Sequence, residues 1–203
     1  MELKKLERSF YRRNTLTVAG ELLGKYLVHN SGEGTTIGMI VETEAYIGPE
    51  DKAAHSYKGR RTNRTEVMFG PPGQAYVYLI YGIHFCFNII TNEKGKPEAV
   101  LIRALEPVKG LDLMRKRRGF SEITKKNKPE LTNGPGKLCN AMGIDKSLYG
   151  ADLTGEKLFL AYPPNRPDFE IASTPRINID YAEEAIDYPW RFLIKGNHFV
   201  SNL

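Results

Sequence analysis

Carboxylate and phenol side chains alternate along the run Val41-Glu42-Thr43-Glu44-Ala45-Tyr46. Side chains two positions apart lie on the same face of a β-strand. A strand here would therefore present Glu42, Glu44 and Tyr46 on one face and the residues between them on the other. A carboxylate in such a position can activate a water molecule, and a neighbouring tyrosine can hold a flat ring against its own face.

Basic and aromatic residues follow this segment. Lys58, Arg60, Arg61 and Arg64 lie close together, and the run Tyr76-Val77-Tyr78-Leu79-Ile80-Tyr81-Gly82 adds tyrosines. Further basic runs occupy residues 115–118 and 125–128. A single basic run usually belongs to a solvated surface. Three such runs around an acidic and aromatic segment favour a nucleic acid as the partner, because arginines can hold phosphates while aromatic rings stack on bases.

The overall composition sets wider limits. With 203 residues, of which 41% are apolar, the chain can bury a core and is short enough to form one domain. Its net charge of +5 decides little, since many enzymes without a nucleic-acid partner are equally basic. Cys86 and Cys139 lack metal-ligand or redox spacing and are expected to be free, buried thiols. The first ten residues lack a signal-peptide pattern and the apolar residues 75–90 are too short to span a bilayer, so we expect a cytoplasmic or nucleoid-associated protein without a membrane partner.

Apolar periodicity and turn residues predict the elements that would position these groups. Asn14 and Thr15 can cap a helix that ends near Gly24. Residues 75–90 predict a hairpin with a tight turn near Tyr81-Gly82, because glycine supplies the positive φ that such turns require. One face of this hairpin would carry Val77, Leu79, Ile83, Phe85, Phe87 and Ile89, and the other Tyr76, Tyr78, His84, Cys86 and Asn88. The other expected elements are strands at 25–29, 36–46, 99–104, 176–179 and 191–194, an irregular excursion at 47–73, a helix that follows Glu106-Pro107 and ends at 115–118, and a short helix within 131–143. The expected fold is a single α+β domain with a curved, mainly antiparallel sheet, a projecting hairpin and peripheral helices.

Taken together, the segment at 41–56, the basic loop after it and the tyrosine run resemble the animal-type alkylpurine (3-methyladenine) DNA glycosylases. The resemblance extends from about residue 16 to the last residues. It implies an open-barrel-like sheet and a monofunctional enzyme that rotates alkylated or deaminated purines out of duplex DNA and hydrolyses the N-glycosidic bond. It implies neither a metal nor an organic cofactor. The expected partner is double-stranded DNA that contains damaged purines, and the protein is expected to act as a monomer.

The resemblance also suggests roles for individual residues. Glu44 would activate the attacking water, a role that its chemistry supports, since a carboxylate can also stabilise an oxocarbenium-like sugar. Arg103 would help to orient that water and contact the DNA backbone, while Glu42 receives no catalytic role. The base pocket would consist of Tyr46, His55, Tyr78 and Asn88, with Asn88 disfavouring normal guanine. Tyr81 would fill the gap left by the extruded base. The predicted contacts to the DNA backbone are Arg60, Thr62, Arg64, Ile83, His84 and Lys137. His84 departs from relatives that carry tyrosine there.

Other interpretations fit the same residues. Glu44 could be a surface carboxylate, the tyrosines could pack in the core, and His55 could be structural. A metal-dependent nuclease could use Glu42, Glu44, Asp51 and His55 as ligands. A protein that only senses damage would use the same pocket without catalysis.

Overall fold

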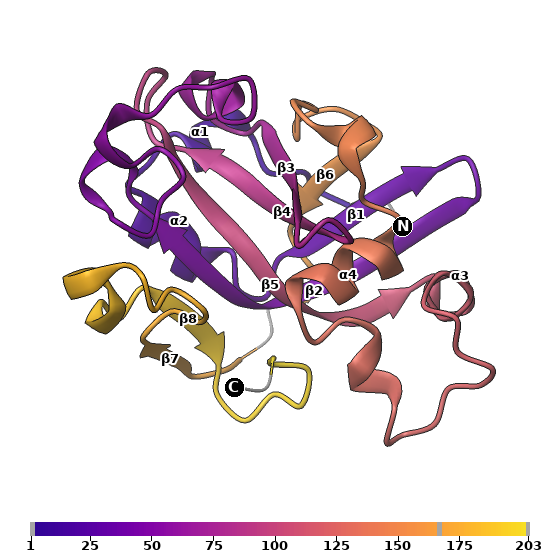
Figure 1. Ribbon diagram of the computed structural model, residues 1–203. Helices are drawn as coiled ribbons and strands as arrows, with labels where there is room; N and C mark the ends of the chain where they lie inside the picture. The colour runs from indigo at the N-terminus through magenta and orange to yellow at the C-terminus, as the bar shows by residue number, and fades with distance from the viewer. Residues whose placement is uncertain (1–2, 166–167, 202–203) are drawn as a thin grey trace.

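The computed structural model describes residues 3–165 and 168–201, which form one curled antiparallel sheet with short helices around it (Figure 1). The principal strand order is β3-β4-β5-β2-β1-β6; β8 pairs with β2, and β7 pairs with β8. The strands are β1 (Tyr26–Ser31), β2 (Gly34–Tyr46), β3 (Ala75–Ile80), β4 (His84–Thr91), β5 (Glu98–Lys109), β6 (Leu158–Ala161), β7 (Ile171–Thr174) and β8 (Arg191–Ile194). The sheet curls into a half-barrel, so the predicted α+β class with an open-barrel-like sheet is confirmed.

Short helices lie around the sheet. The α-helices are α1 (Arg8–Tyr11), α2 (Thr15–Glu21), α3 (Leu111–Arg117) and α4 (Pro135–Met142). The 3-10 helices are η1 (Gly48–Glu50), η2 (Tyr57–Gly59), η3 (Glu66–Phe69), η4 (Lys128–Leu131), η5 (Lys146–Leu148) and η6 (Glu183–Asp187). The predicted cap of α2 is confirmed, because Asn14 Oδ1 accepts hydrogen bonds from the Leu16 and Thr17 amides at 3.1 and 3.2 Å. Among the described residues, no helix has the length and apolar character needed to cross a bilayer.

The hairpin of β3 and β4 has two chemically different faces, as its alternation predicts. Val77, Phe87 and Ile89 belong to the main core. On the opposite face, Tyr76 pairs with Asn88, Tyr78 with Cys86 and Ile80 with His84. The turn lies at Tyr81 and Gly82, whose φ angles are 52° and 73°. Both are in the left-handed region, which costs glycine little but is unusual for tyrosine.

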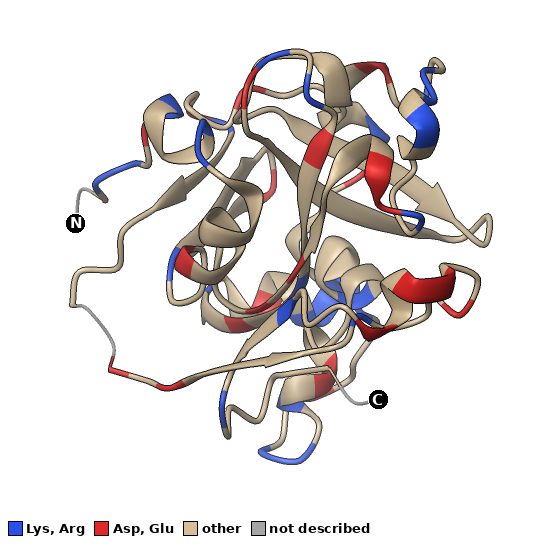
Figure 2. Ribbon diagram, turned by 90° about the vertical axis from the view of Figure 1, so that its left-hand side faces the viewer, with Lys and Arg blue, Asp and Glu red and all other residues tan. Residues whose placement is uncertain are grey.

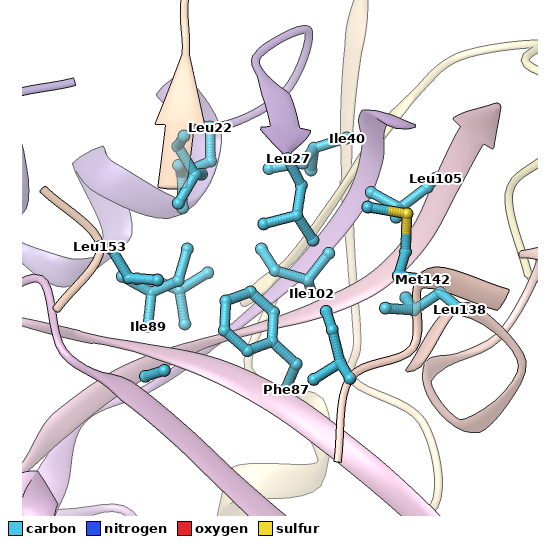
Figure 3. Close-up of a cluster of buried hydrophobic side chains, with 14 of the residues drawn as sticks. Leu22, Leu27, Ile40, Phe87, Ile89, Ile102, Leu105, Leu138, Met142 and Leu153 are labelled. Carbon is cyan, nitrogen blue, oxygen red and sulfur yellow. The ribbon is translucent and has the colours of Figure 1, made fainter. Parts of the chain in front are cut away.

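The core fills the inside of the curled sheet (Figure 3). Leu27 and Ile40 come from β1 and β2, Phe87 and Ile89 from β4, and Ile102 and Leu105 from β5. Leu22 closes one end from the turn after α2, while Leu138 and Met142 of α4 cover another part. The buried apolar surface therefore holds β2, β4 and β5 in fixed positions, and these strands, together with β3, carry the candidate chemical groups.

Several elements differ from the expectations. Residues 176–179 are irregular, and the strand in this region is β7, which ends before Pro175. Ionic contacts of Arg176 and the positive φ of Asn178 (59°) replace a ladder there. Strand β5 continues beyond the expected end at residue 104, past Pro107, to Lys109. Proline lacks an N–H donor, but β5 tolerates it here because this part of the strand pairs with β2 alone, beyond the stretch that pairs with β4. Strand β6 and helix α1 were not predicted.

Basic residues are distributed over several sides of the molecule (Figure 2). The view shows Lys and Arg on helices and loops at both ends of the sheet, with Asp and Glu interspersed. The net charge therefore does not identify a binding face by itself. The site has to be located from the cavities and the groups that line them.

Candidate active site

Glu44 is a buried carboxylate near the end of β2. Its side chain is 0% exposed, so the interpretation as a surface residue is wrong. Its Oε1 accepts a hydrogen bond from the Ile177 amide at 2.8 Å and lies 3.2 Å from Arg103 Nη1. Its Oε2 accepts a hydrogen bond from the Tyr46 hydroxyl at 2.8 Å. These contacts hold the carboxylate in one orientation.

A cavity of about 260 Å³ opens beside this carboxylate. Its wall includes Tyr46 and Ile177, which donate hydrogen bonds to Glu44, and Arg103, which forms an ion pair with it. The carboxylate therefore lies directly behind the wall. The remaining lining residues are Ala53, His55, Met68, Tyr76, Tyr78, Ile80, Tyr81, His84, Cys86, Asn88, Ala99, Leu101, Pro135, Gly136, Asn178, Ile179 and Tyr181.

Three rings form one aromatic side of the cavity. The imidazole of His55 meets the Tyr78 ring edge to face, with centroids 4.6 Å apart, and His55 Nδ1 lies 2.9 Å from the Tyr76 hydroxyl. The Tyr76 and Tyr78 rings are 5.1 Å apart. Burial, with the charges of Arg64 and Arg60, lowers the pKa of His55 to about 4. His55 is consequently neutral at pH 7, so it does not repel a cationic ring.

Asn88 lies on the same side, at the base of the hairpin. Its side chain is buried, and Nδ2 donates to the Tyr76 carbonyl at 3.2 Å across the strand pair. This contact fixes the amide against the cavity wall. Cys86 also lines the cavity, and it and Cys139 are free and buried, as expected.

Asp51 occupies a separate ionic site beside Tyr46. Arg176 Nη1 and Nη2 donate to its two oxygens at 2.6 and 2.8 Å. The amides of Ile47 and Ala53 bind the same carboxylate at 3.1 and 3.0 Å. The Arg176 guanidinium also lies 4.8 Å from the centroid of the Tyr46 ring. Asp51 thus fixes the chain on both sides of the pocket.

The side chains required by the metal-dependent alternative are not gathered in one place. Asp51 binds Arg176, Glu42 binds Arg103 and Arg191, and His55 faces the tyrosines. Within residues 3–165 and 168–201, no group of three or more His, Cys, Asp and Glu side chains is arranged to hold a metal ion. The particular ligand set of that alternative therefore has no geometric basis in the described residues.

Of the residues predicted to fill the stack or contact the flanking DNA, Tyr81 and His84 line the cavity, whereas the others lie outside its lining. Tyr81 is 79% exposed and Ile83 72% exposed at the hairpin tip, next to exposed His84. The Arg64 guanidinium lies 4.8 Å from the Tyr78 centroid, while Arg60 and Thr62 line a neighbouring cavity of about 380 Å³. Lys137 is in the first turn of α4, where its Nζ donates to Asn133 at 2.8 Å.

Several residues of the site were missed in the sequence. Tyr76 shares a strand face with Tyr78, and that alternation could have identified it. Ile177 and Tyr181 come from the irregular segment after β7, and Arg176 and Arg191 reach the site from positions more than 120 residues beyond the carboxylates that they bind. No local pattern marks residues that act through such distant contacts.

Comparisons with known proteins show the family of the chain. A family model described as methylpurine-DNA glycosylase matches residues 9–198. Several bacterial relatives carry the name "Putative 3-methyladenine DNA glycosylase". One from Desulfitobacterium hafniense (strain Y51) is 53% identical over 202 residues, which cover 98% of this chain and 99% of the relative. One from Alkaliphilus oremlandii (strain OhILAs) is 56% identical, covering 97% and 98%. One from Bacillus cytotoxicus is 55% identical, covering 95% and 97%.

Proposed function

Because the chain belongs to the methylpurine-DNA glycosylase family, a family of hydrolases that act on N-glycosyl bonds in DNA, we propose that it is a monofunctional glycosylase of base excision repair. It rotates an alkylated or deaminated purine out of double-stranded DNA and hydrolyses its N-glycosidic bond with a water activated by Glu44, leaving an abasic site. The observation that carries this proposal is the buried, hydrogen-bonded carboxylate of Glu44 directly behind the wall of an aromatic cavity.

The cavity suits a flat, electron-poor base. Tyr46 and Tyr78 offer ring faces, and stacking contributes about 1–3 kcal/mol per base. A purine that carries a positive charge after alkylation gains further attraction to these faces. Neutral His55 adds an aromatic edge without adding positive charge. Asn88 would disfavour the exocyclic amino group of normal guanine.

Glu44 retains the capacity to bind a water. A carboxylate offers about four acceptor positions, whereas the described residues supply two hydrogen-bond donors, Tyr46 and Ile177, together with the ion pair to Arg103. The remaining position on Oε2 would accept the water hydrogen. Glu44 then takes the proton as the water oxygen bonds to C1′ and the base departs with the bonding electron pair. The negative charge also stabilises the oxocarbenium-like sugar.

Arg103 and the rim residues hold the DNA. Arg103 orients the water and contacts the backbone from the cavity wall. A base can reach the cavity only after it leaves the stack, and the exposed Tyr81 ring would fill the gap. Arg60, Thr62, Arg64, Ile83, His84 and Lys137 would contact the flanking DNA backbone. The enzyme would act as a monomer and associate with the nucleoid through its substrate.

Excision from defined duplexes tests the proposal. Oligonucleotides bearing 3-methyladenine, 7-methylguanine, hypoxanthine or ethenoadenine are incubated with the protein, and abasic sites are then cleaved with alkali. We expect excision of damaged purines without strand cleavage before alkali, with the cationic methylpurines favoured because they are better leaving groups. Full activity in excess EDTA is expected. Binding without excision of any lesion would favour a damage-sensing protein, and loss of activity in EDTA would favour a metal-dependent enzyme.

A further inference from the structure

Glu42 is a second buried carboxylate that the proposed mechanism leaves unused. It lies on β2 two residues before Glu44 and is 0% exposed. Its Oε1 accepts hydrogen bonds from Arg103 Nε at 2.9 Å, Arg191 Nε at 2.6 Å and Ser201 Oγ at 2.9 Å. Its Oε2 accepts a hydrogen bond from the Ser201 amide at 2.7 Å. A buried carboxylate with this many charged and polar donors is a rigid anchor.

Glu42 and Glu44 hold different parts of the same guanidinium. Arg103 Nε donates to Glu42, its Nη1 lies 3.2 Å from Glu44 Oε1, and its Nη2 donates to Ser201 Oγ at 3.2 Å. Because a guanidinium is planar, fixing two of its edges determines where the third points. The contacts to Glu42 and Ser201 therefore determine how Arg103 meets Glu44 and the cavity.

The backbone supports the same arrangement. Glu42 pairs with Ala104 and Thr43 with Ile102, so the register shifts at Arg103. Such bulges change the direction of a side chain and leave its backbone less constrained by the ladder. The orientation of Arg103 thus depends strongly on the partners of its side chain.

The charges of the cluster also balance. Glu42 and Glu44 carry two negative charges, and Arg103 and Arg191 carry two positive charges, all on side chains no more than 7% exposed. Burial acts to lower the pKa of Arg103, but the charges of Glu44 and Glu42 outweigh it and raise the pKa, so the guanidinium stays charged. Without the charge of Glu42, the cluster would hold two buried positive charges against a single negative charge.

We infer that Glu42 is a positioning residue for excision and that Ser201, near the C-terminus, completes the contact by holding both Glu42 and Arg103. This inference rests on the proposed function, since it assigns the pair a role in aligning Arg103 with Glu44. Ser201 is on the last described stretch of chain, 159 residues from Glu42, so the C-terminal segment contributes directly to the geometry of the site.

Two substitutions test the inference by rate and by binding. Ser201→Ala removes the hydroxyl but keeps the amide that binds Glu42, and Glu42→Gln removes the charge. We expect single-turnover excision to fall roughly tenfold to a hundredfold for each, the scale expected for misalignment at a reacting centre. Affinity for a duplex containing a 2′-fluorinated lesion nucleotide, which resists hydrolysis, should be unchanged. Ser201→Thr, which keeps the hydroxyl, should restore the rate.

A double-mutant cycle separates positioning from general stability. If Glu42 and Ser201 act through Arg103, Ser201→Ala should cost little further rate when combined with Arg103→Ala. Thr43→Val serves as a matched control, because Thr43 lies between the two glutamates and donates to the Ala19 carbonyl at 2.9 Å on the opposite face. It should lower the melting temperature and leave excision by the folded protein unchanged.

The outcomes are distinguishable. An absence of excision by the wild-type protein would defeat the proposed function itself. If the wild type excises damaged purines while Ser201→Ala excises at the wild-type rate, the inference fails and the proposed function stands. If Ser201→Ala lowers the excision rate by the same factor in the Arg103→Ala variant as in the wild type, the inference also fails. Because Ser201→Ala removes only one hydroxyl, it decides the matter even if Glu42→Gln does not fold.

Discussion

Two buried arginine–carboxylate sites lie on either side of Tyr46, and they differ in what they leave available. The Asp51 carboxylate receives two bonds from Arg176 and two from backbone amides, which uses all of its roughly four acceptor positions. Within the described residues, Glu44 accepts two hydrogen bonds, forms an ion pair with Arg103 and lies behind a cavity wall. Equal burial therefore does not imply an equal role: a saturated carboxylate stabilises the fold, whereas an incompletely bound one beside a cavity can act on a ligand.

Glu44→Gln should produce the largest change in excision. The amide keeps the shape of the side chain but is a poor base, so we expect single-turnover excision to fall about 10² to 10⁴-fold, the usual contribution of a general base. Lesion binding should be retained, as measured by fluorescence anisotropy. Excision at the wild-type rate would remove the distinction between the two sites.

Asp51→Asn should instead affect mainly stability. The substitution leaves Arg176 buried without a counter-charge, and breaking such a pair costs about 3–5 kcal/mol. Urea unfolding should show this loss in the free energy of unfolding. At a temperature where the variant is folded, excision should fall much less than in Glu44→Gln, and the opposite ranking would contradict the comparison.

The lowered pKa of His55 predicts how the free energy of unfolding depends on pH. Its folded-state pKa of about 4 lies below the ordinary value of 6.5, so the unfolded chain binds a proton first as the pH falls. The contribution of neutral His55 to the free energy of unfolding is fully present above pH 6.5, and it is lost as the pH falls from 6.5 to about 4. When the pH falls from 7 to 5, the free energy of unfolding of the wild type should decrease by about 2 kcal/mol more than that of His55→Gln. Equal losses in urea titrations at the two pH values would show that His55 is not held neutral.

Tyr46→Phe should give a smaller effect that separates the two sites. The hydroxyl of Tyr46 binds Glu44, while its ring lies against Arg176. Removing the hydroxyl alone should lower excision about tenfold, from the loss of one hydrogen bond to a charged group. Trp190→Leu is the matched control. The Trp190 ring lies 5.0 Å from the guanidinium of Arg176, which binds Asp51, and it has no part in the contact to Glu44 that Tyr46 makes. That control should reduce stability and leave excision by the folded protein unchanged.

Arg60→Ala should have the smallest effect, confined to DNA affinity. Arg60 is exposed at the rim, and the loss of one phosphate contact should make the slope of log affinity against log salt shallower by about 1 for every lesion. Affinity measurements at several salt concentrations would check this. An effect that depends on the lesion would mean that Arg60 acts on the base rather than on the backbone.

The sequence predicted the parts of this molecule that depend on local pattern. A period of two correctly put Glu42, Glu44 and Tyr46 on one face of β2, and it separated the core and pocket faces of the hairpin. The cap at Asn14 and the turn at Tyr81-Gly82 follow from residue chemistry alone. These features involve neighbours in the chain, so their signal is present in short stretches of sequence.

The contacts that complete the site could not be predicted in this way. Arg176, Arg191 and Ser201 reach the carboxylates of Asp51 and Glu42 from the other end of the chain. Their positions depend on β8 pairing with β2, which no local periodicity encodes. The expected strand at residues 176–179 failed for the same reason, since long-range ionic contacts override the β propensity of its isoleucines.

A crystal structure of the Glu44→Gln variant bound to a duplex containing ethenoadenine would show whether the cavity receives a base that has left the stack. We expect the lesion inside the cavity against Tyr46 and Tyr78, the Tyr81 ring in the gap left in the stack, and C1′ of the lesion nucleotide facing residue 44. A lesion that remains stacked in the duplex, with no base in the cavity, would contradict this expectation.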